Sequence, residues 1–364
     1  MVIVKTRVLC NIENLAEKNA ISSRRNTDYS ALAIEMEELF YSNAKYHPTR
    51  WYTAPPKYRG VYVTTDSGGW RFDRTTIPEG VAKLLCFGGS TMFSTTTRDQ
   101  GAIPAMLQRH LAPGVACVLN YGMGGYSTYA EIGAFCEAMR REKNVALAIF
   151  YDGVNETAMY LEMLMHRREQ TFLAEAGYPF MSVVRVATRN FLSEQGVVWR
   201  LAVRLAGMIC RITGNRGCGF RGDSVGRAVP ERERFYHAKR IVDGYIANLK
   251  ILQGIGQSFG VGCVFVWQPD IFTTGKRLTE RERRMAENYP PLLKKLSRMV
   301  YRLVVSHPTF RDLGGVDGVN WLNQLEGEHF FDYCHVSEEA NEVIAAEIAK
   351  VCKRRTPAEF WKCS

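Results

Sequence analysis

The sequence predicts an α/β protein whose mostly parallel sheet is covered by helices on both faces. Two observations support this prediction. Near-continuous apolar runs alternate with amphipathic, helix-like segments, and strands that are buried on both faces are apolar throughout. The 364 residues, of which 46% are hydrophobic and 23% charged, can bury a large core as one large domain or two smaller ones.

Four apolar runs have the length and composition of buried strands, because they are short and rich in aliphatic residues, phenylalanine and cysteine. They cover residues 81–87, 115–119, 145–151 and 261–267. Amphipathic helices are expected in the intervals between these runs, over residues 103–111, 128–141 and 231–259.

Two further helices have recognisable first residues. Thr279 and Glu282 have the spacing of a capping box, so a helix is expected to begin near residue 279. Ser337 is a suitable N-cap for a last helix over residues 337–351, whose apolar residues fall on one face.

Two segments lie outside this alternation. Residues 1–79 carry aromatics, prolines and turns with little periodicity, and we expect them to form an N-terminal extension packed on a domain of residues 80–364. Residues from about 160 to 230 are expected to form a helical, arginine-rich insertion in that domain. Its arginines among apolar residues are Arg185, Arg189, Arg200, Arg204 and Arg211. They favour either helices with a solvated basic face, or a lid that faces an anionic acyl acceptor or a membrane surface.

Charge and hydropathy narrow the range of partners. Lys and Arg outnumber Asp and Glu by 47 to 37, and the net charge of +10 favours anionic partners. No zinc finger, aromatic RNA-binding motif or long basic tail supports binding to nucleic acid. No run of about 18 apolar residues predicts a transmembrane segment, and the first residues lack the pattern of a secretory signal, so we expect a cytoplasmic protein.

The ten cysteines include no C-x-x-C pair and no cluster with histidine, so neither a metal site nor a cofactor is expected. Several of them lie inside the apolar runs, where a thiol behaves as a small hydrophobic group. This distribution favours a reducing compartment over a disulfide framework.

Small and polar residues follow three of the predicted strands, over residues 88–91, 120–128 and 152–156. Ligands of an open parallel sheet lie beyond the carboxyl ends of its strands, so these three segments should meet at one crevice. Glycine allows tight turns and close backbone approach there, while serine, threonine and asparagine supply hydrogen-bonding groups.

Ser90 is the candidate nucleophile in the first of these segments. A serine nucleophile needs a base, an acid that orients the base, and an oxyanion hole. His335 is the candidate base, and Asp332, three positions earlier in an expected loop, is placed to orient or otherwise assist it. The candidate oxyanion donors are the backbone N–H groups of Ser90 and Gly125 and the side-chain amide of Asn155.

The order of these motifs resembles that of the SGNH (GDSL-like) hydrolase superfamily, in particular its GGST-type esterase branch. The motifs are GGST at Ser90, N-x-G-x-x-G ending at Gly125, GVNE at Asn155 and D-x-x-H at His335. The resemblance implies a flavodoxin-like three-layer α/β/α sandwich that hydrolyses or transfers ester-linked acyl groups. It also implies that Ser90 is the nucleophile, His335 the base and Asp332 its partner. Gly125 and Asn155 are then the oxyanion donors.

The resemblance covers about residues 80–352 without the insertion, and the sequence departs from the family pattern at two positions. Gly89 stands where the GDS motif has aspartate, and Glu156 stands where aspartate is usual. Neither departure removes a catalytic group, but both weaken any transfer of a particular substrate from the family.

Two other motif matches are excluded as nucleophile sites. Residues 256–260 read G-x-S-x-G, but they end a predicted helix and precede a strand, whereas a nucleophile elbow follows a strand and opens a helix. Residues 222–224 read GDS, but they follow a glycine- and arginine-rich stretch rather than a buried strand. Asn155 also begins a glycosylation sequon, a role incompatible with an amide inside a site.

The sequence therefore predicts a serine esterase that acts through an acyl-enzyme on a small-molecule or glycan ester, with acetylated carbohydrate as the first substrate class. Gly89 and Gln268 are candidates for lining the crevice, although Gln268 is equally consistent with an ordinary polar residue at a strand end. Three alternatives remain: an O-acyltransferase with the same site, a non-catalytic binding module, and a phosphate- or nucleotide-binding domain. The last lacks the glycine-rich phosphate signatures at the first turn and leaves His335 without a role.

Overall fold

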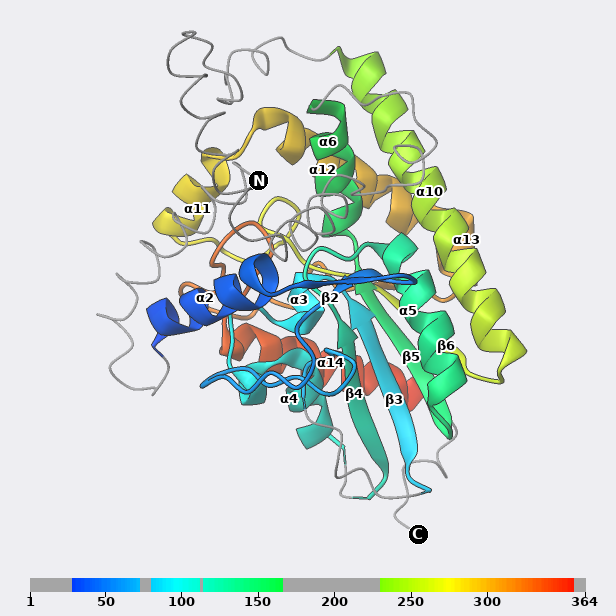
Figure 1. Ribbon diagram of the computed structural model, residues 1–364. Helices are drawn as coiled ribbons and strands as arrows, with labels where there is room; N and C mark the ends of the chain where they lie inside the picture. Colours follow the sequence, from blue (N-terminus) through cyan, green and yellow to red (C-terminus); the bar gives the residue numbers. More distant parts are fainter. Residues whose placement is uncertain (1–27, 73–79, 112–113, 166–229, 357–364) are drawn as a thin grey trace, which may run out of the picture.

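The computed structural model describes residues 28–72, 80–111, 114–165 and 230–356 (Figure 1). Most of the insertion expected at about 160–230, including its five arginines, lies outside the described residues, as does the GDS match at 222–224. None of the described helices is both long and apolar enough to cross a membrane.

A five-stranded sheet with the order β4-β3-β5-β6-β7 forms the centre of the molecule, and all of its neighbouring strands are parallel. The strands are β3 (Ala82–Gly88), β4 (Ala116–Gly122), β5 (Val145–Asp152), β6 (Gly262–Trp267) and β7 (Val316–Asp317). The first four confirm the strands predicted from the apolar runs. β7 was not predicted, because two residues carry no recognisable pattern.

Aromatic side chains in register form a row across the sheet, one or two positions before the last residue of each strand. Phe87 of β3 pairs with Tyr121 of β4 on one side and with Phe150 of β5 on the other, and Phe150 pairs with Phe265 of β6. The rings of Phe87 and Phe150 are 5.0 Å apart and nearly parallel, and those of Phe150 and Phe265 are 5.4 Å apart. All four side chains are fully buried. This row gives the loops above it a rigid base.

Helices cover both faces of the sheet, which gives the three-layer α/β/α architecture (Figure 1). α4 (Ile103–Arg109) and α14 (Glu338–Arg355) pack together on one face. On the other face α5 (Thr128–Arg141) packs against α10 (Glu231–Ser258), which also contacts α6 (Val154–Met165) and α12 (Pro291–Ser306). The remaining helical segments are α3 (Ser90–Phe93), η2 (Asp99–Gly101), α11 (Glu280–Glu287) and α13 (Pro308–Asp312).

The predicted helix starts are present in the structure. Thr279 and Glu282 form a complete capping box at the start of α11, and the Ser337 side chain accepts a hydrogen bond from the Ala340 N–H at the start of α14. The helix that begins near residue 279 is interrupted, because α11 ends at Glu287 and the prolines that follow cannot continue its hydrogen bonding. The chain resumes as a separate helix, α12.

The N-terminal part, residues 28–72, contains α2 (Tyr29–Glu37), the π-helical segment η1 (Glu38–Ser42) and a hairpin of β1 (Lys45–His47) and β2 (Trp51–Thr53). The fully buried Arg71 fixes it to the loop after α3. Its guanidinium donates to the carbonyls of Phe93 and Ser94 at 2.6 Å and of Thr97 at 2.7 Å. Its Nε atom also donates to Asp99 Oδ1, in an ion pair at 2.8 Å.

Candidate active site

Ser90 is placed by the turn that ends β3 and starts α3. Gly89 is the N-cap of this short helix, and Ser90 is its first residue. A side chain at position 89 would collide with the amide nitrogen of Asn155 and would lie 3.0 Å from the carbonyl oxygen of Tyr126, so only glycine fits. The N–H of Ser90 belongs to a first helical turn, where backbone N–H groups have no acceptor within the helix.

His335 joins Ser90 to Asp332. Its Nε2 atom lies 2.7 Å from Ser90 Oγ, and its Nδ1 atom lies 2.6 Å from Asp332 Oδ2. These residues come from opposite ends of the domain, with 245 positions between Ser90 and His335. The structure therefore brings the three predicted residues into the order hydroxyl, imidazole, carboxylate.

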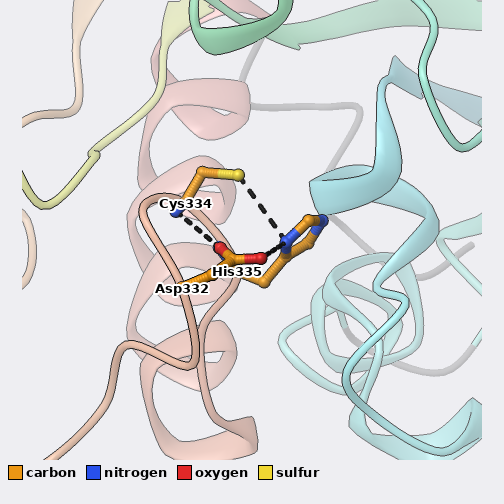
Figure 2. A group of neighbouring side chains, drawn as sticks. All are labelled: Asp332, Cys334 and His335. Atoms are coloured by element: carbon orange, nitrogen blue, oxygen red, sulfur yellow. Dashed lines mark hydrogen bonds and ion pairs between the residues drawn. The ribbon is translucent and has the colours of Figure 1, made fainter. Parts of the chain in front are cut away.

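The loop before α14 holds the imidazole and the carboxylate in this arrangement (Figure 2). Asp332 Oδ1 accepts hydrogen bonds from the backbone N–H groups of Cys334 and His335, both at 2.8 Å. The loop is closed at its ends, because the Phe331 N–H donates to the His335 carbonyl at 2.9 Å. Asp332 thus folds its own loop and at the same time faces the imidazole.

The environment of Asp332 keeps it ionised. Burial by itself would raise the pKa of this carboxyl, but the charge and hydrogen bond of His335 and the two backbone N–H donors outweigh burial and hold the pKa well below its ordinary value. An ionised Asp332 orients the Nδ1–H tautomer of His335, which leaves Nε2 as the acceptor that faces Ser90.

Asn155 lies close to the turn that carries Ser90 and is hydrogen-bonded to the loop that contains Gly125. The amide nitrogen of Asn155 donates to the Tyr126 carbonyl at 2.6 Å, and it also lies against Gly89. An amide group carries two hydrogens, so Asn155 retains a second one for a ligand. Gly125 immediately precedes Tyr126 and has a positive φ of 77°, a conformation that favours glycine. The Asn155 amide therefore lies beside the residue before Ser90, and Gly125 lies in the loop whose Tyr126 carbonyl accepts from that amide.

Glu156 links the two loops that carry these donors. Its Oε1 atom accepts from the N–H and the hydroxyl of Thr128, at 2.8 and 3.1 Å, at the start of α5. Its Oε2 atom accepts from the N–H of Gly153 at 3.3 Å. In the sequence, Glu156 stood out only as a departure from the family pattern. Its contacts with Thr128 and Gly153 could not be predicted from that pattern.

A buried acidic pair lies next to Glu156. Glu131 is fully buried and Asp152 is 4% exposed, although Asp152 opens the third polar segment that was expected to face the crevice. Burial, supported by the charge of Glu156 and opposed by a hydrogen-bonding interaction with Asp152, raises the pKa of Glu131 to about 8. Burial and then the charge of Glu131 raise the pKa of Asp152 well above its ordinary value. Glu131 therefore holds a proton at neutral pH.

Gln268 supports the turn after Ser90 instead of facing an open crevice. Only 3% of the residue is exposed, its Oε1 atom accepts from the Thr91 hydroxyl at 2.7 Å, and its N–H donates to the Asp152 carbonyl at 2.8 Å. Of its two interpretations, the structure favours a polar residue at a strand end.

The N-terminal part contributes two aromatic residues beside the oxyanion loop that the sequence did not identify. The hydroxyl of Tyr52 donates to the Gly124 carbonyl, and a side chain at position 125 would meet this hydroxyl at 2.6 Å. The ring of Phe40 lies 3.1 Å from the position that a side chain at 124 would take. The abundance of aromatics before residue 72 was the available signal, but nothing in it indicated which ring reaches the site.

The expectation that cysteine and histidine do not cluster is wrong at one position. Cys334 precedes His335, its Sγ atom lies 3.6 Å from His335 Nδ1, and both lie beside the Asp332 carboxylate (Figure 2).

The G-x-S-x-G match at 256–260 lies where α10 ends and β6 follows, and the Ser258 hydroxyl donates to the Gly254 carbonyl. Ser258 therefore ends a helix and precedes a strand, which is the arrangement that excluded it as a nucleophile.

Comparisons with known proteins give matches only among solved structures: no protein-family profile matches the sequence, and no curated protein matches it significantly. Est24, a carbohydrate acetylesterase from Sinorhizobium meliloti, is 12% identical with a TM-score of 0.40 over 75% of this chain and 99% of its own. Axe2, an acetylxylan esterase from Geobacillus stearothermophilus, is 12% identical with a TM-score of 0.38 over 78% of this chain and 97% of its own. A member of the lipolytic protein G-D-S-L family from Veillonella parvula is 9% identical with a TM-score of 0.37 over 75% of this chain and all of its own. These similarities are weak, so the function proposed below depends on the geometry of the site.

Proposed function

We propose that the protein is a serine esterase of the SGNH type that hydrolyses an ester-linked acyl group through an acyl-enzyme. One observation carries the proposal: Ser90 Oγ, the two ring nitrogens of His335 and Asp332 Oδ2 form a continuous chain of contacts at 2.7 and 2.6 Å. These distances are within hydrogen-bonding reach, as a nucleophile, its base and an orienting acid require.

In the proposed mechanism, His335 Nε2 accepts the proton of Ser90 as the serine oxygen attacks the ester carbonyl. The imidazolium that forms is stabilised by the ionised Asp332, and it then protonates the departing alcohol. Water, activated by the same imidazole, attacks the acyl-enzyme and releases the acid, which restores the Ser90 hydroxyl.

The negative charge on the tetrahedral intermediate is held by three donors. They are the N–H groups of Ser90 and Gly125 and the Asn155 amide, whose position against Gly89 keeps it close to the nucleophile. Such preorganised donors stabilise the developing charge without having to reorganise during the reaction.

The proposed substrate class is an acetylated carbohydrate or another small ester. It rests on the resemblance to the GGST-type esterases and on the arginine-rich insertion expected at about 160–230. A panel of nitrophenyl esters of increasing acyl length, followed by acetylated sugars, tests this choice. Faster turnover of long-chain than of acetyl esters contradicts it.

The central experiment compares nitrophenyl acetate hydrolysis and fluorophosphonate labelling of the wild type, Ser90→Ala and Ser258→Ala. We expect Ser90→Ala to lose both turnover and label. Ser258→Ala is the matched control, because it removes the serine of the excluded G-x-S-x-G match, and it should retain both. Undiminished labelling of Ser90→Ala contradicts the proposal, and the absence of any labelling of the wild type favours a binding module. Acyl transfer to an added sugar in excess of hydrolysis would instead identify an O-acyltransferase.

A further inference from the structure

A thiol lies where a Ser-His-Asp arrangement does not require one. The ligand atoms of Asp332, Cys334 and His335 all lie within 4.8 Å of one another (Figure 2). A carboxylate, a thiol and an imidazole are together the donor set that zinc and cadmium prefer, whereas magnesium and calcium prefer oxygen ligands.

The spacing of the sulfur and nitrogen atoms suits a tetrahedral metal. Zn–S and Zn–N bonds of about 2.3 and 2.05 Å at the tetrahedral angle place the two ligand atoms about 3.5 Å apart. The distance between Cys334 Sγ and His335 Nδ1 is 3.6 Å. The separation of these two atoms therefore matches that of two ligands on one tetrahedral zinc ion.

The carboxylate needs a small movement. Oxygen and nitrogen ligands of tetrahedral zinc lie about 3.3 Å apart, whereas Asp332 Oδ2 is now 2.6 Å from His335 Nδ1. Oδ2 must therefore withdraw while Oδ1 stays on its two backbone N–H donors. Solvent reaches two of the three ligands, because 16% of the His335 side chain and 11% of that of Asp332 are exposed.

We propose that Asp332, Cys334 and His335 form an inhibitory binding site for a thiophilic divalent cation such as Zn²⁺ or Cd²⁺. The inhibitory part of this inference rests on the proposed esterase function, while the binding part does not. The cation takes the position that the Nδ1 proton occupies in the active arrangement, so binding and catalysis exclude each other.

Binding of the cation changes the position of two protons, one on Cys334 and one on His335. The Cys334 thiol releases its proton to solvent, and the thiolate sulfur binds the cation. The neutral imidazole binds through Nδ1, and its proton is then carried on Nε2. An Nε2 that already carries a proton cannot accept the proton of Ser90, so the nucleophile is not activated.

Inhibition of ester hydrolysis by zinc is the first test, with each protein compared with its own activity in EDTA. We expect zinc to inhibit the wild type reversibly, and Cys334→Ser to raise the half-inhibiting concentration at least about tenfold, as loss of a ligand should when loss of outer-shell partners alone costs 10–100-fold. Cys136→Ser is the matched control, since this partly exposed thiol lies on α5 and should leave the sensitivity unchanged. Equal sensitivity of Cys334→Ser and wild type, or equal inhibition by magnesium, overturns the proposal.

Cadmium binding is the second test, and it does not depend on activity. Cadmium–thiolate bonds absorb in the ultraviolet, so titration of the full chain should show one thiolate fewer in Cys334→Ser than in wild type or Cys136→Ser. Identical spectra overturn the site. If the band depends on Cys334 but the protein hydrolyses no ester, the result supports the cation site and contradicts the proposed esterase function. The same band in an active enzyme that zinc does not inhibit overturns the inhibitory role.

Discussion

The carboxylate of Glu156 accepts a hydrogen bond from the backbone N–H of Thr128 at 2.8 Å and thereby ties the loop of Asn155 to the loop of Gly125. These loops follow different strands, and each carries a proposed oxyanion donor. Together with the hydrogen bond from the Asn155 amide to the Tyr126 carbonyl, Glu156 therefore supports the spacing between two groups that are proposed to act on the same oxygen atom.

Glu156→Ala should lower kcat by about 10–100-fold with a much smaller effect on KM, because small misplacements of catalytic groups mainly affect the transition state. Steady-state kinetics with a nitrophenyl ester measures both constants. Glu156→Asp, which retains the carboxylate, should recover part of the loss. Glu347→Ala, a change at the surface of α14, is the control. A Glu156→Ala enzyme with wild-type kcat contradicts the positioning role.

Asn155→Ala should lower kcat by about 10²–10³-fold, equivalent to roughly 3–4 kcal/mol, because one preorganised oxyanion donor is removed. Its hydrogen bond to the Tyr126 carbonyl is also lost, so stability must be measured by urea unfolding alongside the kinetics. A stably folded variant with near-normal turnover would exclude Asn155 from the oxyanion hole.

Asp332→Asn should lower kcat by about 10⁴-fold, the size of the loss when this substitution is made in a Ser-His-Asp triad. An asparagine amide can present its NH₂ group to His335 Nδ1 and so stabilise the wrong tautomer. Asp243→Asn is the matched control, since this exposed aspartate on α10 forms an ion pair with Lys239 at the surface. Equal activity of the two variants would show that His335 needs no carboxylate.

Glu131→Gln should change how stability depends on pH. The pKa of Glu131 is raised from 4.5 to about 8 in the folded protein, so between these values the folded state holds a proton that the unfolded chain has released. The free energy of unfolding therefore falls as the pH rises from about 4.5 to 8, and it shows no further change from this group above 8. The variant lacks this slope and should gain stability over the wild type by a few kcal/mol, to order of magnitude, near pH 8.

Urea unfolding of the wild type and Glu131→Gln at both ends of this pH range makes the comparison. The difference between the two proteins should be smallest at the acid end, where Glu131 is protonated in both states. Parallel pH profiles for the two proteins would mean that the buried carboxyl does not retain its proton.

The sheet could be predicted because strands that are buried on both faces need uninterrupted apolar runs. Leu84, Leu85 and Phe87 are fully buried, as the first run indicated. By contrast, β7 pairs only Val316 and Asp317 with β6, and such a short pairing is decided by where the preceding helices bring the chain.

The residues of the candidate site could be predicted where they lie close to the end of a predicted strand or to the start of a predicted helix. Ser90 and Asn155 follow strands directly, and His335 precedes a well-capped helix. Glu131 could not be identified, because on α5 it resembles any charged residue of an amphipathic helix, and its burial results from the packing of α10. Cys334 was counted as one thiol among ten, since sequence alone does not show which way a loop side chain points.

The contacts of Arg71 determine how far the chain can be shortened from its N-terminus. The guanidinium occupies three main-chain oxygens in the stretch just past the nucleophile, at Phe93, Ser94 and Thr97. A shortened protein that starts at residue 80 would contain every proposed catalytic group and yet lack the donor that holds these three carbonyls in place. We therefore expect the segment before residue 80 to fold together with the stretch that follows the nucleophile, and a protein trimmed at that position to be less stable than the full chain.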